Sequence, residues 1–294
     1  MRRKSGYFAF VFLLGLGSNR FTAQNSADSP FYQVGISEAA VYTDLKIALK
    51  EGEKVYKLQL LNTPFDPKIF PKIIRLSNLQ CLMIASNGIA ELPPELISFR
   101  SLIFFSSSKN ELHSLPKEFA ALQNLNYVEL YDTKLDSFPQ SIAYLHRLKS
   151  LTFENNQTDT FRLPENFGEL SALEELTFYK VKIHSLPHSI GDLKKLKTLY
   201  LSDAQLKTLP SSIGKLIQLQ TLVLDNNQLT SLPKSLFKLS NLAYLSLKNN
   251  RIEHISDYVC YLTSLAELDL SGNPISEQER AILKALLPGC KIVY

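Results

Sequence analysis

Residues 219–241 read LQTLVLDNNQLTSLPKSLFKLSN, and this stretch decides the fold. With Leu219 as position 1, apolar side chains stand at positions 1, 4, 6, 11, 14, 18 and 21. Positions 4 and 6 follow a period of two, which predicts a short strand with one buried face. The opposite face of that strand, made by positions 3, 5 and 7, is expected to look outward.

The same pattern recurs along most of the chain. The leucines that open successive units are 23 residues apart, except for one interval of 25. A looser unit that opens at Val55 precedes them, so residues 55–275 hold about ten units. The opening leucines are Leu79, Leu102, Leu125, Leu148, Leu173, Leu196, Leu219, Leu242 and Leu265. A period of this length indicates a stacked repeat architecture.

Two units show the second half of the repeat most clearly. Residues 186–201 read LPHSIGDLKKLKTLYL, and residues 209–224 read LPSSIGKLIQLQTLVL. With this LPxxIGxLxx half, the chain resembles the leucine-rich repeat family in its 23-residue form. The resemblance implies an α/β fold: a leucine-rich repeat solenoid with a curved parallel sheet on the concave face, irregular or helical convex segments, and helical caps.

The size of one unit requires stacking. About six buried apolar side chains are too few to offset the conformational entropy of one unit, so neighbouring units must share their apolar faces. Stacking then aligns position 4 of every unit into one buried column of a parallel sheet. The predicted column is Leu58, Leu82, Phe105, Val128, Leu151, Leu176, Leu199, Leu222, Leu245 and Leu268.

Position 9 is usually asparagine, whose amide can bond the backbone groups left open where the chain leaves the strand. These residues are Asn87, Asn110, Asn156, Asn227, Asn250 and Asn273. Thr133, Val181 and Ala204 replace the asparagine in three units, and residues 156–162 hold a two-residue insertion. We therefore expect irregular loops around Val181 and Ala204, with water in place of the missing amides. Position 15 is usually proline, which suits a turn rather than a strand.

Both ends of the stack need a cover, because a terminal repeat would otherwise expose its apolar face. Residues 37–54 are predicted to form the N-terminal cap, with a helix over residues 37–50 that begins at Ser37. Residues 276–294 are predicted to form the C-terminal cap. There, a helix over residues 276–287 ends at Pro288-Gly289, and residues 290–294 add a final strand.

The N-terminal residues predict export. Arg2, Arg3 and Lys4 precede an apolar run over residues 7–17, an order typical of a secretory signal peptide. We assign residues 1–23 to this peptide and residues 24–36 to a linker. The run is shorter than the roughly 20 apolar residues of a membrane anchor. The expected location is therefore secreted, periplasmic or cell-surface, with no membrane span after cleavage; the alternative is a hydrophobic N-terminal helix packed on the domain.

Composition and motifs exclude several classes of function. The formal net charge is +4, and residues 1–23 hold four basic residues and no acid, so the remainder carries 4 − 4 = 0. This excludes a strongly basic nucleic-acid surface. The sequence has no His-Glu-x-x-His and no Gly-x-Ser-x-Gly motif, so it predicts no catalytic residue, no metal and no cofactor. Pairing of Cys260 with Cys290 stays open, with free thiols favoured.

Function is therefore expected on the outward face of the strands. Aromatic and acidic residues gather there in the middle units: Phe104, Tyr127, Glu129, Tyr131, Glu154, Glu175, Tyr179 and Tyr200. Tyrosine offers a large contact area at little entropic cost, and acidic charge steers a basic partner. The alternative is that aromatic residues are present only because they suit pleated strands.

The sequence favours a secreted or envelope-exposed, non-catalytic protein that binds a protein or peptide partner on its concave face. Leucine-rich repeat relatives act widely as protein-binding modules, and this is what the resemblance implies. The alternative function is an intracellular scaffold or regulatory subunit that docks a phosphatase or a small GTPase, as similar repeats do.

Overall fold

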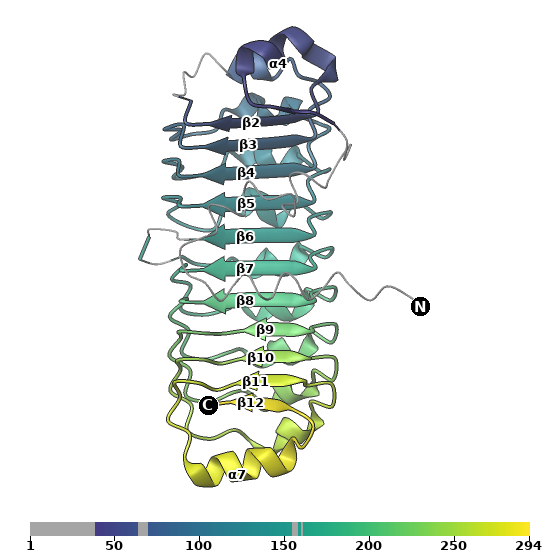
Figure 1. The fold of residues 1–294 in the computed structure, drawn as a ribbon. Helices are drawn as coiled ribbons and strands as arrows, with labels where there is room; N and C mark the ends of the chain where they lie inside the picture. Colours follow the sequence, from purple (N-terminus) through teal and green to yellow (C-terminus); the bar gives the residue numbers. More distant parts are fainter. Residues whose placement is uncertain (1–38, 64–69, 155–157, 160) are drawn as a thin grey trace.

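The computed structural model describes residues 39–63, 70–154, 158–159 and 161–294. Over these residues, twelve strands form one parallel sheet in sequence order, as Figure 1 shows. The strands are β1 (Val41–Tyr42), β2 (Lys57–Leu61), β3 (Cys81–Ala85), β4 (Phe104–Ser108), β5 (Tyr127–Tyr131), β6 (Ser150–Glu154), β7 (Glu175–Tyr179), β8 (Thr198–Ser202), β9 (Thr221–Val223), β10 (Tyr244–Ser246), β11 (Glu267–Asp269) and β12 (Lys291–Val293). Each repeat thus adds one strand beside the last, as a solenoid requires.

The strand register confirms the predicted core column. Leu58 pairs with Leu82, Leu82 with Phe105, and the same step continues through every repeat to Leu268. Every residue of the column is at most 1% exposed. Because side chains alternate across a strand, positions 3, 5 and 7 lie on the opposite face, which we call the concave face.

Helical segments lie behind the sheet in Figure 1 and, for the first and the last helix, beyond its two ends. They are α4 (Leu45–Glu51), η2 (Gly52–Lys54), α5 (Phe70–Ile73), η4 (Pro94–Ser98), η5 (Lys117–Ala121), α6 (Gln140–Ala143), η6 (Glu165–Glu169), η7 (His188–Asp192), η8 (Ser211–Lys215), η9 (Lys234–Lys238), η10 (Asp257–Tyr261) and α7 (Glu277–Leu286). The position-15 proline precedes most of them in an extended conformation, for example Pro187 before η7. Consecutive segments pack closely, since a Cβ on Gly214 of η8 would overlap the Ser235 carbonyl of η9.

The asparagine ladder forms where the sequence predicts it. Asn110 Oδ1 accepts from the backbone N–H groups of Asn87 and Ile89 at 3.0 and 3.3 Å, and its Nδ2 donates to the Ile84 carbonyl at 3.2 Å. Asn227, Asn250 and Asn273 likewise bond the backbone of the preceding repeat. Each amide therefore ties one turn to the next.

The repeats without this asparagine are irregular, as expected. His184 and Gln205, which follow Val181 and Ala204, have left-handed backbones with φ of +61° and +58°. Phenylalanine side chains fill the neighbouring core, with ring centroids 5.1–6.3 Å apart. We call this the phenylalanine cluster: Phe138, Phe153, Phe161, Phe167 and Phe178. Aromatic packing thus joins the repeat of Val181, which lacks the side-chain amide, to the repeat before it.

The N-terminal cap differs from its prediction. Val41 and Tyr42, assigned by sequence to the helix, instead form strand β1 and pair with Lys57 and Leu58 of β2. Helix α4 begins later, where Asp44 accepts from the Ile47 N–H at 3.0 Å. A β-branched and an aromatic residue suit a strand, and here they cover the otherwise open edge of β2.

The C-terminal cap agrees with its prediction. Helix α7 starts at the Ser276 cap, and β12 pairs with β11. Glu279, which is 7% exposed, accepts from the Ile255 N–H and lies 2.9 Å from His254 Nδ1, so α7 is fixed to the last repeat.

Several predictions concern residues outside the described ranges. These are the signal peptide (1–23), the linker (24–36), the helix start at Ser37, and Asn156. Within the described ranges, no helix combines the length and the apolar character needed to cross a membrane.

Candidate functional site

The register brings the predicted site residues of β5, β6 and β7 together on the concave face. Tyr131 pairs with Glu154, and Glu154 pairs with Tyr179, so these three form one row across adjacent strands. Neighbouring strands are about 4.8 Å apart, which makes such side chains direct neighbours. The Lys180 ammonium lies 5.0 Å from the centre of the Tyr179 ring and extends the row towards its rim.

The predicted residues differ in how much surface they present. Glu175 is exposed, whereas five others are partly buried: Tyr127, Glu129, Tyr131, Glu154 and Tyr179. The expectation that Phe104 and Tyr200 are exposed is wrong, since they are 0% and 8% exposed. Phe104 packs with Cys81 and Met83 of β3, and Tyr127 lies against this group. The accessible part of the predicted site therefore lies on β5, β6 and β7.

The Glu175 carboxylate loses part of its hydration inside the concavity, although the residue as a whole is exposed. Burial raises the pKa of Glu175, while a hydrogen bond from Ser150 opposes the shift and the nearby Glu174 adds to it. Burial also raises the pKa of the Tyr127 phenol, with Glu175 and Glu174 contributing in the same direction. A cation placed beside such a carboxylate would stabilise its ionised form.

A second acidic region on β9–β11 was not among the predicted site residues. Asp225 Oδ1 accepts from Ser246 Oγ at 2.5 Å and from the Lys248 N–H at 3.2 Å, while Asp269 Oδ1 accepts from Ser271. Burial raises the pKa of Asp225, and Asp269 adds to the rise. Asp225 and Asp269 stand at positions 7 and 5 of their repeats, and these positions predict that both residues lie on the concave face.

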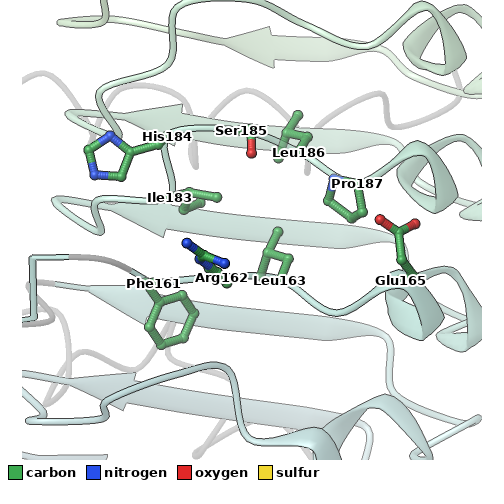
Figure 2. A pocket seen from close by; sticks show the side chains of 9 residues that line it. All are labelled: Phe161, Arg162, Leu163, Glu165, Ile183, His184, Ser185, Leu186 and Pro187. Carbon is green, nitrogen blue, oxygen red and sulfur yellow. The ribbon is translucent and has the colours of Figure 1, made fainter.

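A pocket lies away from the concave face, at the turns after β6 and β7. Its volume is about 480 Å³, and Figure 2 shows its lining: Phe161, Arg162, Leu163, Glu165, Ile183, His184, Ser185, Leu186 and Pro187. His184 and Glu165 stand at opposite ends of this lining in Figure 2. His184 Nε2 lies 3.1 Å from the Asp159 carbonyl. The His184 imidazole and the Glu165 carboxylate therefore lie apart, and these two groups form no acid–base pair in the pocket.

In the described part of the chain, no group of three or more His, Cys, Asp or Glu side chains could hold a metal ion. Cys260 and Cys290 form no disulfide in the structure, and the Cys290 thiol contacts the Lys291 carbonyl at 3.6 Å.

Comparison with known proteins supports the fold. Residues 217–275 match the family described as "Leucine rich repeat", and residues 194–237 match "Leucine Rich repeats (2 copies)". An internalin of Listeria monocytogenes is similar over 82% of this chain and 74% of its own, with 19% identity and a TM-score of 0.63. The Toll–Spatzle complex of Drosophila includes a chain similar over 79% of this chain and 31% of its own, with 23% identity and a TM-score of 0.68. No curated protein matches the sequence.

Sequence period, sheet register and family matches agree. The repeated LPxxIGxLxx half, the buried position-4 column and the asparagine ladder occur together along one parallel sheet. Residues 194–275 match leucine-rich repeat families, and the described part of the chain folds as a leucine-rich repeat solenoid.

Proposed function

We propose that this protein binds a protein or peptide partner on the concave face of β5–β7, without catalysing a reaction. The observation that supports this most is the row Tyr131–Glu154–Tyr179, set by the strand register. These side chains stand on a rigid sheet and are only partly buried, so a partner would meet them already in place. Preorganised tyrosines of this kind are common hot spots of protein interfaces.

We propose that the partner presents a basic segment. Glu129, Glu154 and Glu175 lie on this surface, and Asp225 and Asp269 continue the negative charge towards the C-terminal end. A cation would stabilise the partly desolvated Glu175 carboxylate, and the summed charge would speed the encounter at low salt.

We propose further that the protein acts outside the cytoplasm. The order of residues 1–23 supports this, and the Toll–Spatzle complex is one case in which a structure of this fold holds a protein partner. Fractionation of cells that express the tagged chain with and without residues 1–23 tests the location. Export of the full chain alone is expected; equal retention of both forms in the cytoplasm would refute it.

The binding proposal is tested by removing the two tyrosines of the row. The double variant Tyr131→Ala and Tyr179→Ala should weaken partner capture by about 30- to 900-fold, since each lost hot-spot tyrosine costs roughly 1–2 kcal/mol. Capture is measured by quantitative affinity purification with the mature protein, followed by titration with each purified candidate partner.

The control carries the same chemical change away from the concave face. Tyr144 and Tyr261 are 43% and 60% exposed behind the sheet, and their double alanine variant should keep full capture. Melting of both variants should stay close to that of the unchanged protein. Loss of capture in the control variant, or full capture by the Tyr131 and Tyr179 variant, would place the binding surface elsewhere.

A further inference from the structure

The convex side of the last repeats carries large apolar side chains in contact with solvent. Ile217, which follows η8, is 58% exposed, and Tyr258 and Tyr261 of η10 are 45% and 60% exposed. Segment η9 lies between η8 and η10 and contacts both, so these side chains belong to one continuous surface. The helical segments of the repeats lie behind the sheet in Figure 1, so this surface faces away from the concave face.

Three exposed lysines accompany these apolar side chains. Lys215 is in η8, and Lys234 and Lys238 are in η9. The Lys234 ammonium lies 5.4 Å from the centre of the Tyr258 ring, whose centre lies 5.8 Å from that of the Tyr261 ring. Lys215, Lys238 and Tyr261 stand at position 20 of three successive repeats, so they form one column. We call the following six residues the C-terminal convex surface: Lys215, Ile217, Lys234, Lys238, Tyr258 and Tyr261.

The lysines of this surface leave it positively charged. Within the described residues, none of the three forms an ion pair. Residues 211–217 and 234–240 contain these three lysines and no acid, and residues 257–263 add one acid, Asp257. By contrast, η4, η5, η6 and η7 each contain at least one acid. Positive charge on the convex side is therefore concentrated in the last repeats.

The residue types of this surface favour an anionic bilayer over an acidic protein. Its cations are all lysine, which is depleted in protein interfaces, whereas arginine is enriched there. At an anionic bilayer, each lysine contributes through its charge and needs no fixed geometry. Tyrosine suits the membrane interface, because its ring enters the apolar layer while its hydroxyl stays among the head groups.

The charge on the other side of the sheet determines how the protein would lie on such a bilayer. The concave face carries Glu129, Glu154 and Glu175, which anionic head groups repel. Contact through the lysines of η8 and η9 is therefore the favoured orientation. In that orientation the concave face of β5–β7 looks away from the bilayer and stays open to a partner.

We propose that the C-terminal convex surface docks this protein on an anionic lipid bilayer. The three lysines lie beside the head-group phosphates, and Ile217, Tyr258 and Tyr261 enter the interface. The docking is peripheral, because the contacts come from side chains on the surface of a folded solenoid. It stands independently of the partner proposed for the concave face, since the two surfaces lie on opposite sides of the sheet.

Co-sedimentation of the mature protein with vesicles tests the role of the lysines. Vesicles of phosphatidylglycerol and phosphatidylcholine in equal parts should bind the protein, more weakly as salt rises, and vesicles of phosphatidylcholine alone should bind it far less. Lys215→Gln, Lys234→Gln and Lys238→Gln together should weaken binding to the anionic vesicles about 100-fold, or roughly fivefold for each lysine.

The matched control removes the same charge from the other end of the chain. Lys50→Gln, Lys72→Gln and Lys117→Gln, all at exposed positions, should leave most of the binding intact. Melting of both triple variants should stay close to that of the unchanged protein. Equal loss of binding in the two variants, or no binding of the unchanged protein to anionic vesicles, would overturn the proposal.

Fluorescence gives a second measurement, which reports on the apolar side chains. The sequence has no tryptophan, so Tyr261→Trp introduces a single indole. Its emission should shift to the blue when anionic vesicles are added. Tyr144→Trp, on α6 at a position 43% exposed, should show no shift. Binding to poly-glutamate as tight as binding to vesicles, with no shift of the Tyr261→Trp emission on vesicles, would refute docking on lipid and indicate an acidic protein partner instead.

Discussion

Position 8 of each repeat shows how single residues shape this solenoid. Wherever this position is described, its backbone is left-handed, with φ between +50° and +74°: Asn62, Ser86, Lys109, Asp132, Lys180, Asp203, Asn226, Asn249 and Gly272. Such a conformation is costly for most side chains. In every such turn but the last, at Gly272, it persists because the turn directs the N–H group to the next repeat, as Asn226 does to the Lys248 carbonyl at 2.8 Å. Local strain and inter-repeat bonding are therefore coupled.

Asn227 at the next position stabilises the same turn through its side chain. Its amide makes five hydrogen bonds to backbone groups of two repeats and is 6% exposed. Asn227→Ala should lower the free energy of unfolding by about 3 kcal/mol, because buried N–H and carbonyl groups lose their partners. Urea titration measures the loss. Asn241→Ala removes a single exposed bond to Ile217 and should cost under about 1 kcal/mol; equal costs at both sites would contradict this explanation.

At the scale of elements, the repeat period predicted the features that depend on residues within one repeat and its neighbours. The position-4 column, the C-terminal helix and the final strand follow from spacing and from a clear cap at Ser276. The N-terminal cap was misplaced because Val41 and Tyr42 fit both a helical and an extended pattern. Asp44, followed directly by the helical residues, was the available signal for the true helix start.

The candidate site could be predicted from the sequence only in part, because the sequence pattern gives the face on which a side chain lies but not its exposure. Strand alternation places Tyr131, Glu154 and Tyr179 on one face and in one row, and the structure confirms that row. Alternation does not say what lies over that face. Phe104 obeys the same alternation and is nevertheless buried, because its exposure depends on contacts distant in sequence.

At the scale of the whole molecule, cooperativity depends on contacts between neighbouring repeats. Each repeat touches the one before and the one after, so the stability of the stack passes through every interface in turn. The phenylalanine cluster spans three successive repeats in the middle of the chain, of which the first has Thr133 and the last has Val181 in place of the ladder asparagine. The coupling of the two halves therefore depends on aromatic packing more than on side-chain amides.

This dependence predicts that weakening the cluster separates the two halves. Phe153 lies 5.3–5.6 Å from three other rings and is fully buried, so Phe153→Ala should cost about 3–5 kcal/mol. Urea unfolding should then show two transitions, with amide exchange in β2–β5 and β8–β11 rising at different urea concentrations. Phe237→Ala removes a comparably buried ring near the C-terminal end and should lower stability while β2–β8 still unfold together. A single, merely shifted transition for Phe153→Ala would mean that backbone bonding alone holds the stack together, since the sheet hydrogen bonds of β6 and β7 remain in that variant.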